Sequence, residues 1–443
     1  MRTLGSILLV FLGAGVASAA CSASSNSHIF GTGGSGAGNT GTGNGDTGTG
    51  NSGQGGNTGI MFDAGSGTGG SITTGVNCNV TDPNADMDGD GWTPAQGDCN
   101  DCDPNVNPGA IDTITMGDGG VLKGDEDCDG KPGNLPQPCD NGLAVADPSA
   151  INAAKAVELC TILTDPKKFG LKSAKWVLPD GSAPPNNANY ALGHGILSAF
   201  GPNVNVQGGT RMLGLSSGTA RQPSDPGYQD VGGFDKGYTS KSPVGFPKES
   251  PACPGVITGQ PHDGVGLEVE LVAPTNAKGF SFSFNFFTYE WPDYVCSTYN
   301  DFFVALLMPF PTGQTDGNIS FDSMGNPVSV NNAFVEVCGC AGSGPPCITG
   351  FPPAQKSFSC ALGDSKLIGT GFGQDTSFGQ DHASTYWLQT KAPVKPHEDF
   401  TLRWGVYDSG DGVLDTTTLV DNFQWIASAG TVTVGTAPIE QPK

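Results

Sequence analysis

The chain has 443 residues, of which 69 are glycine, 33 are proline and only 14% are charged. This length is enough for two or three domains, and so much glycine and proline excludes a protein built mainly from long helices. The net charge of −23 leaves no basic surface for nucleic acid, so we expect no DNA or RNA partner. Nine of the 43 acidic residues are glutamate, so 43 − 9 = 34 are aspartate, the acid that favours turns and metal-binding loops.

The first 20 residues have the features of a bacterial secretory signal. After a positive start, residues 7–12 form an apolar core that is too short for a stable membrane span. Residues 18–21 resemble a bacterial lipobox, with Ser18 where leucine is usual, and this resemblance implies cleavage and lipidation at Cys21. Ordinary cleavage after Ala19 is the alternative and would release the protein. We therefore expect a lipoprotein that is anchored to the outer membrane and exposed at the cell surface.

Residues 21–77 are rich in glycine, serine, threonine and asparagine. Between Gly31 and Gly75, 19 of 45 residues are glycine, and almost nothing is available for burial. Such a segment cannot offset the entropy lost on ordering, so we predict a disordered tether. A glycine-rich coil of this length spans about 35–40 Å on average.

Residues 78–133 form an acidic module, the strongest chemical signal in the chain. The segment from Asp82 to Asp129 holds twelve aspartates, one glutamate and one lysine. A calcium loop opens with acids at positions one, three and five, glycine at six and a carbonyl ligand at seven, which here are Asp86, Asp88, Asp90, Gly91 and Trp92. Position twelve is Gly97, so Asp98 or Asp101 must close a slightly longer loop.

Two further acidic groups follow this loop. In a second loop, Val106 stands in place of the turn glycine, and positions one, three, five, seven and twelve are Asp101, Asp103, Asn105, Asn107 and Asp112. A third group is the triplet of Asp125, Asp127 and Asp129 around Cys128. A disulfide from Cys128 to Cys99 or Cys102 would bring this triplet back onto the first loops. All these ligands are oxygen, which favours Ca²⁺, and extracellular modules bind it with a Kd on the order of 10⁻⁴–10⁻³ M. The predicted metal ligands are Asp86, Asp88, Asp90, Trp92, Asp98, Asp101, Asp103, Asn105, Asp112, Asp127 and Asp129. The alternative is an acidic linker without metal.

The order of these residues resembles a known pattern. It is the metal-binding motif of bacterial surface proteins, which is itself similar to thrombospondin type 3 calcium repeats. The resemblance rests on Asp86-x-Asp88-Gly-Asp90-Gly-Trp92, Gly97-Asp98-Cys99-Asn-Asp101-x-Asp103-Pro, Pro108-Gly-Ala110 and Asp127-Cys128-Asp129-Gly130. It covers about fifty residues and departs from the pattern between Ala110 and Asp127, where a longer glycine-rich stretch lies.

Residues 140–427 are predicted to be an antiparallel, jelly-roll-like β-sandwich with one or two helices, so the predicted fold class is mainly β. A helix is expected from Pro148, capped by Asp147, to the Asp165–Pro166 pair. Strict alternation of apolar and polar residues predicts strands at 280–286 and 400–406. Further candidate strands are 267–272, 302–307, 334–337, 386–390 and 419–426. Residues 428–443 are expected to form a C-terminal tail.

This region also resembles the bacterial choice-of-anchor L domain. The resemblance rests on the segments 282–296 and 299–304, and on Gly410-Asp-Gly-Val-Leu-Asp415 followed by Val420-Asp421-Asn-Phe423. It implies a secreted surface protein but defines no biochemical activity.

The cysteines indicate an oxidising compartment. If Cys21 carries lipid, twelve of the thirteen remain, enough for six disulfides. Cys160 is expected to staple the predicted helix to the sheet. The cysteines at 338, 340, 347 and 360 are interpreted as a disulfide-braced loop and not as a zinc site, because no histidine lies nearby.

A second metal site is possible at one end of the sandwich, and turn chemistry is the equal alternative. Its predicted ligands are Glu290, Asp301, Asp408, Asp411, Asp415 and Asp421. Residues 214–218 fit a nucleophile-elbow pattern, but Pro223 and Pro226 follow too closely for the helix that an elbow requires. We therefore expect no enzyme.

Three functions compete on this evidence. The first is a calcium-binding structural or adhesion protein at the cell surface. The second is a carbohydrate-binding module that uses exposed aromatic residues such as Trp291 and Tyr294, so a glycan or cell-surface partner is expected. The third, a secreted hydrolase, needs Ser216 beside a histidine or two carboxylates about 5–9 Å apart.

Overall fold

The computed structural model describes residues 80–113, 115–116, 122–133, 137–332, 334–339, 346–349, 356–373, 382–427 and 430–439. The predicted signal peptide, the lipidation site Cys21 and the predicted tether lie outside these residues. All described residues belong to one of the chain's two compact units, Gly67–Lys443. Among them, no helix combines the length and the apolar character needed to cross a membrane.

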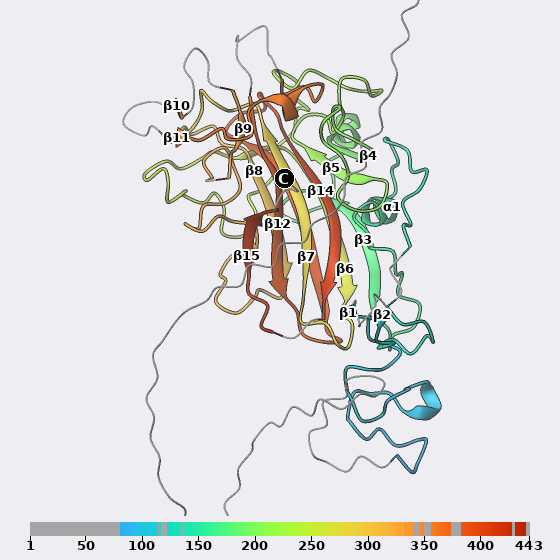
Figure 1. The fold of residues 1–443 in the computed structure, drawn as a ribbon. Coiled ribbons are helices and arrows are strands. Elements are labelled where there is room, and N and C mark those ends of the chain that lie inside the picture. Colours follow the sequence, from blue (N-terminus) through green and yellow to red (C-terminus); the bar gives the residue numbers. More distant parts are fainter. Residues whose placement is uncertain are drawn as a thin grey trace, which may run out of the picture. The chain divides into compact units, whose positions relative to one another are not determined.

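Two antiparallel sheets pack face to face and form the core of the protein (Figure 1). The smaller sheet has the order β3-β6-β13-β8, with β3 Gly170–Val177, β6 Pro261–Val272, β13 Asp399–Ser409 and β8 Phe302–Met308. The larger sheet has the order β15-β12-β7-β14-β5-β4. Its strands are β15 Gly435–Pro438, β12 Ala383–Pro393, β7 Gly279–Thr288, β14 Thr416–Ile426, β5 Met212–Ser216 and β4 His194–Leu197, and β9 Val337–Cys338 pairs with β12. The predicted antiparallel β-sandwich is confirmed.

The remaining elements are short. Two hairpins stand apart from the sandwich: β1 Thr115–Met116 with β2 Leu122–Lys123, and β10 Cys347–Thr349 with β11 Lys356–Phe358. The helices are α1 Ala150–Lys155 and the 3₁₀ turns η1 Pro94–Gln96, η2 Ala188–Gly193 and η3 Ser365–Leu367. Strand β15 comes from the segment expected to be a C-terminal tail, and it pairs with β12.

Aromatic side chains from both sheets fill the space between them. The alternating phenylalanines of β7 point inward and meet β13 and β8 of the opposite sheet. Ring centroids lie 5.5 Å apart for Phe280 and Phe400, 5.6 Å for Phe282 and Trp404, and 4.8 Å for Phe284 and Phe303. These spacings are typical of favourable aromatic pairs, so the aromatic stripe is core.

The opposite face of β7 differs from the expectation of a wet face. Ser283 and Asn285 are fully buried, and Phe287 packs against Phe200 and Phe372 in a second apolar cluster. The segments that carry these two phenylalanines cover the sheet. The alternation of apolar and polar residues therefore reports the direction of each side chain and not its exposure.

The predicted helix after Asp147 is much shorter than expected. Its N-cap is Ser149, whose side chain accepts a hydrogen bond from the Asn152 amide, while Asp147 accepts one from the Ser149 amide. Helix α1 ends at Lys155, because Glu158 adopts a left-handed conformation with φ of 69°. The following residues, rich in β-branched side chains, run extended beside β3.

Four disulfides lie among the described residues: Cys99–Cys128, Cys139–Cys160, Cys253–Cys296 and Cys338–Cys360. Cys102 and Cys347 are disulfide-bonded as well. Cys160 therefore joins the chain before α1 and does not staple the helix to the sheet. The bond between Cys338 and Cys360 supports the interpretation of that region as a disulfide-braced loop. So many disulfides indicate an extracellular or other oxidising location.

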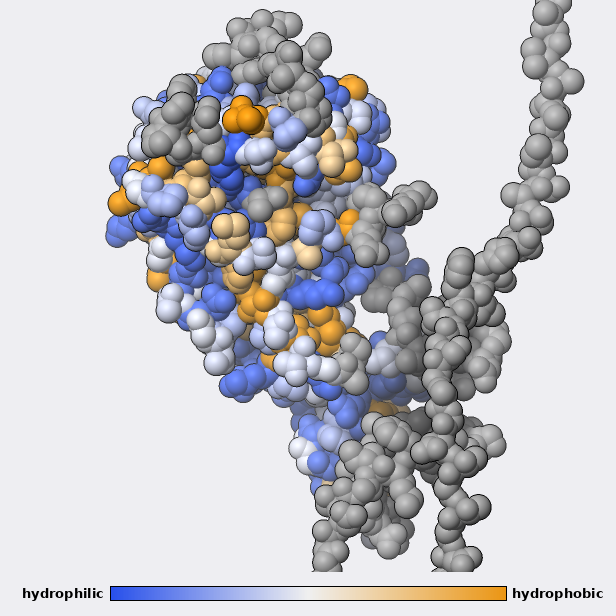
Figure 2. Space-filling model, turned by 60° about the vertical axis from the view of Figure 1, so that its left-hand side comes forward, coloured by the Kyte–Doolittle hydropathy of each residue, from blue (hydrophilic) through white to orange (hydrophobic). Residues whose placement is uncertain are grey.

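The surface mixes polar and apolar residues. On the face shown in Figure 2, apolar patches are interrupted by hydrophilic residues. Trp291, expected at an exposed edge, is buried, and its ring meets Phe358 edge to face at 6.3 Å. It therefore cannot serve as an exposed platform for a sugar.

Candidate metal centre

The first acidic loop is folded tightly around its own carboxylates. Gly89 and Gly91 both take positive φ, and their amides donate to the two carboxylate oxygens of Asp86 at 2.7 and 2.9 Å. Asp86, Asp88 and Asp90 thereby each offer an oxygen within 4.8 Å of the others. This spacing suits a cation of the size of Ca²⁺, whose oxygen ligands lie at 2.3–2.6 Å.

Asp98 and Asp101 close this loop, as the spacing of the sequence allows. Both offer oxygens within 4.8 Å of one another and of Asp88, which belongs to both sets. The Asp101 carboxylate also accepts a hydrogen bond from the amide of Met87 at 2.9 Å, which draws the two ends of the loop together. Five aspartates of residues 86–101, here called the first cluster, therefore surround one region.

Two buried oxygens of this cluster, one on Asp98 and one on Asp88, have no protein partner. Asp98 is only 7% exposed, and its Oδ1 accepts a hydrogen bond from the amide of Asn100 at 2.8 Å. Its Oδ2 is buried and accepts none, and the same holds for Oδ2 of Asp88. A buried carboxylate oxygen without a partner is costly, and a cation between Asp88 and Asp98 would satisfy both.

Burial and the crowding of negative charge both raise the pKa values of aspartates in this cluster. Desolvation, followed by the neighbouring carboxylates, raises the pKa of Asp88 to about 6, and desolvation likewise raises that of Asp90 to about 6. The pKa of Asp98 is also raised, mainly by burial. A divalent cation would oppose these shifts by favouring the ionised carboxylates.

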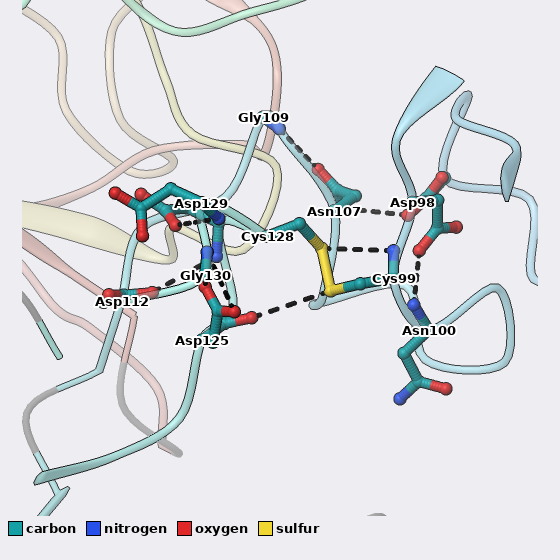
Figure 3. Close-up of a disulfide and its surroundings, with 12 residues drawn as sticks. Asp98, Cys99, Asn100, Asn107, Gly109, Asp112, Asp125, Cys128, Asp129 and Gly130 are labelled. Carbon is teal, nitrogen blue, oxygen red and sulfur yellow. Dashed lines mark hydrogen bonds between the residues drawn. A yellow bond between two sulfur atoms is a disulfide. The ribbon is translucent and has the colours of Figure 1, made fainter. Parts of the chain in front are cut away.

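A second cluster forms around the Cys99–Cys128 disulfide (Figure 3). Asp112, Asp125 and Asp127 offer oxygens within 4.8 Å of one another. The Asp127 amide donates to Asp112 Oδ1 at 3.2 Å, and burial is the main cause of the raised pKa of Asp127. The disulfide holds this second cluster beside the first, because Cys99 directly follows Asp98.

The structure divides the predicted ligands differently from the sequence pattern. Asp101 joins the first cluster and Asp112 the second, so the predicted loop between them does not gather around one centre. Asp103 accepts hydrogen bonds from the backbone and side chain of Asn105, which makes a local turn. Of the predicted triplet, Asp125 and Asp127 join the second cluster, while the predicted ligand Asp129 pairs with Lys131 at 3.4 Å. Trp92 donates its backbone amide to Asp90 Oδ1 at 2.8 Å.

Asn107, predicted at position seven of the second loop, joins the acidic module to the sandwich through its side chain. It is fully buried, and its Nδ2 donates to Asp90 Oδ2 at 2.8 Å. Its Oδ1 accepts from Thr275 Oγ1 at 2.7 Å and from the amide of Gly109 at 2.9 Å. Thr275 lies in the loop between β6 and β7, so one amide side chain connects a metal-cluster carboxylate to the sandwich.

No family model, curated protein or solved structure matches this chain. The resemblances to the surface-protein metal motif and to the choice-of-anchor L domain therefore remain predictions. The acidic clusters that could hold a metal ion and the several disulfides are consistent with an extracellular β protein.

The carboxylates predicted for a second site divide into two groups. Glu290, Asp301, Asp408 and Asp415 are buried at one end of the sandwich, with Asp411 half-buried beside them. Asp421 lies elsewhere: it accepts a hydrogen bond from the amide of Gln207 and faces Glu158. Burial first, and then Asp421, raise the pKa of Glu158 to about 9.

Ser216, at the centre of the elbow-like pattern, is not placed as a nucleophile. It is buried within β5, and its Oγ donates to the backbone carbonyl of Thr416 at 3.0 Å. A nucleophile elbow needs a sharp turn between a strand and a helix, and this residue lies inside a strand.

Proposed function

We propose that this protein is a calcium-binding structural or adhesion protein of the cell surface. In this proposal, calcium stiffens the acidic module, residues 78–133, and fixes the sandwich relative to it. The observation that carries the proposal is the buried, unpartnered Oδ2 of Asp98, a residue that offers a carboxylate oxygen within 4.8 Å of Asp88 in the first cluster. Disulfides throughout the described residues support a location outside the cell.

Calcium is favoured over other cations by the chemistry of the ligands. Both clusters offer carboxylate oxygens alone, with no histidine and no free thiolate. Zinc and copper prefer nitrogen and sulfur ligands, while magnesium usually keeps several waters and is rarely enclosed by protein ligands only. The two sets of the first cluster share Asp88 and together supply five carboxylates, which suits the larger coordination shell of calcium.

Contacts with the sandwich explain how binding would stiffen the whole unit. Lys167, which precedes β3, donates from Nζ to the carbonyl of Gly91 and to Gln96 Oε1, both at 2.9 Å. Its ammonium lies 5.2 Å from the centre of the Trp92 ring. Asn276 exchanges two hydrogen bonds with the backbone of Ile111 at 3.0 and 2.8 Å. An ordered calcium loop would keep all these contacts in place.

Attachment to the membrane is proposed through a lipid on Cys21 and the glycine-rich segment that follows. The lipobox-like residues 18–21 support this. Metabolic labelling with a fatty acid, compared with a Cys21→Ser variant, tests it: the label is expected on the wild type alone.

Calorimetric titration of the chelator-treated mature chain with calcium tests the central proposal. We expect binding of two or more ions, and stabilisation of about 1.4–2.7 kcal/mol at a ligand concentration of 10–100 times Kd. Asp98→Asn should remove one ion, while Asp82→Asn, an exposed acid outside both clusters, should change nothing. Absence of heat and of any shift in melting temperature in the wild type would reduce the module to a charged linker.

A carbohydrate-binding role is the second candidate, supported by two tyrosines at the loop end of the sandwich. The rings of Tyr294 and Tyr299 are perpendicular with centroids 5.8 Å apart, and Tyr299 is 39% exposed. Aromatic rings at a surface are suited to contact with the apolar face of a sugar. A glycan array tests this, and a ligand whose retention survives Tyr299→Ala would contradict this placement of the site.

A further inference from the structure

Three strands of the sandwich end their inward-facing rows of apolar side chains with a carboxylate. On β13, Phe400, Leu402, Trp404 and Val406 belong to the core, and the next inward position is Asp408. On β8, Leu307, Ala305 and Phe303 are followed inward by Asp301. On β7, four core phenylalanines are followed by Thr288 and then Glu290. Asp408 lies within β13, Asp301 directly precedes β8 and Glu290 lies two residues beyond β7, so the three acids lie at the same end of the sandwich.

The strand register places two of these acids opposite each other. Strands β13 and β8 pair antiparallel with Tyr407 across from Phe302, so the next pair along the same register is Asp408 and Asp301. Side chains that lie directly opposite in a sheet have Cβ atoms about 4.5–5.5 Å apart, and like charges there repel each other. Glu290 approaches from the other sheet, and its charge contributes to the raised pKa of Asp408.

These carboxylates are buried, and several of their oxygens lack a partner, although Asp301 Oδ2 accepts a hydrogen bond from Ser217 Oγ at 3.5 Å. Glu290, Asp301 and Asp408 are at most 1% exposed. Both oxygens of Asp408, Oδ1 of Asp301 and Oε2 of Glu290 are buried and accept no hydrogen bond. The amide oxygen of Asn300, which precedes Asp301, is also buried and unpartnered. This oxygen carries no charge and is a common calcium ligand.

The protein's own cations do not neutralise this group. None of the six ion pairs among the described residues involves the three acids. Buried Lys236 donates from Nζ to the carbonyl of Ser216 at 2.9 Å, and Asp263 and Asp415 affect its pKa more than Asp408 does. At neutral pH, the acids must therefore either keep protons or receive a cation from solution.

We propose that this end of the sandwich binds a calcium ion between the two sheets, with Glu290, Asp301 and Asp408 as its carboxylate ligands. The site is separate from both clusters of the acidic module and does not depend on them. Its oxygens are more widely spaced, since no three of them are among the described sets within 4.8 Å. The ion would therefore draw the strand ends together and take further oxygens such as that of Asn300.

Electrostatics agrees with this geometry. Burial raises the pKa values of Glu290 and Asp408 well above their usual range, and in both cases the charge of Asp301 is the next-largest cause. Burial likewise raises the pKa of Asp301 to about 7. A cation among these groups would favour their ionised forms and would offset the cost of burying them.

The test counts calcium ions in the full mature chain by equilibrium dialysis and compares four proteins at pH 8. The wild type is compared with the double variant Asp301→Asn/Asp408→Asn and with the module variant Asp98→Asn. The matched control is Asp399→Asn, which removes an exposed acid from the opposite end of β13. We expect the double variant and Asp98→Asn each to bind one ion fewer than the wild type, and the control to bind the full number.

The outcomes separate this site from the acidic module. If the double variant binds as many ions as the wild type, the sandwich site is refuted, whatever happens with Asp98→Asn. If Asp98→Asn keeps the full number while the double variant binds one ion fewer, the module proposal fails and the sandwich site stands. Should the double variant fail to fold, Glu290→Gln replaces it: we expect its affinity for one ion to fall at least tenfold, and an unchanged affinity would overturn the proposal.

Discussion

The disulfide Cys99–Cys128 allows a quantitative test of how the two acidic clusters depend on each other. Its sequence separation is 29, so replacing both cysteines with alanine returns about 3.6 kcal/mol of loop entropy to the unfolded module. Calcium must then order the module as well as bind to it. Since about 1.36 kcal/mol corresponds to a factor of ten, the apparent affinity should fall by at least about tenfold and by at most roughly 400-fold.

A second disulfide provides the matched control. Cys139–Cys160 has a separation of 21, which corresponds to about 3.3 kcal/mol, but it lies beside α1 and touches no acidic cluster. Removing it should lower the melting temperature and leave calcium affinity unchanged. Calorimetric titration and thermal melts of both variants measure the two effects.

Two outcomes of these titrations would contradict a preorganising role for the Cys99–Cys128 disulfide. If the Cys99/Cys128 variant binds calcium within twofold of the wild type, the disulfide does not preorganise the clusters. If both variants lose calcium affinity equally, general destabilisation explains the loss, and the Cys99–Cys128 bond has no specific effect on the clusters.

Two further predictions concern the junction and the sandwich. Asn107→Ala removes hydrogen bonds to Asp90, Thr275 and Gly109, at about 1 kcal/mol each. Backbone amides of the acidic module should therefore exchange faster with D₂O in the variant than in the wild type, while those of β7 should not. Unchanged exchange in the module would contradict the bridging role of Asn107. The pKa of Asp301 is raised from 3.8 to about 7, so the folded state retains a proton that the unfolded state releases. Stability of the chelator-treated protein should therefore decrease as the pH rises from 4 to 8, by at most about 4 kcal/mol, in denaturant melts. A flat profile, or the same slope in Asp301→Asn, would contradict this.

The sandwich could be predicted because its signal is local. Alternation along residues 280–286 and 400–406 gives the inward direction of each side chain, and the structure follows it. The cover over the outer face of β7 could not be predicted, because Phe200 and Phe372 come from distant loops. The length of α1 was overestimated, since the cap and the alanines are visible but the left-handed Glu158 is not.

The acidic residues show the same division between local and distant information. The spacing of residues 86–90 is enough to predict a shared centre, whereas the choice of Asp125 over Asp129 depends on which cysteine Cys128 bonds. For the acids of the sandwich, the alternation of side-chain direction along each strand indicates which of them lie on the same face. Asp408 continues the inward row of β13, while Asp421 has the opposite parity to the buried Val420 of β14 and so faces away from that row.

The order of strands has a consequence for how the chain reaches its native state. The chain changes sheets from β6 to β7 and again from β12 to β13 to β14, so neighbours within a sheet come from distant segments. Phe302 and Tyr407, for example, pair across about a hundred residues. Such non-local pairing makes assembly slow. The four described disulfides instead span 21 to 43 residues. Oxidation can therefore close these loops before the sheets form, without committing the chain to a wrong strand order.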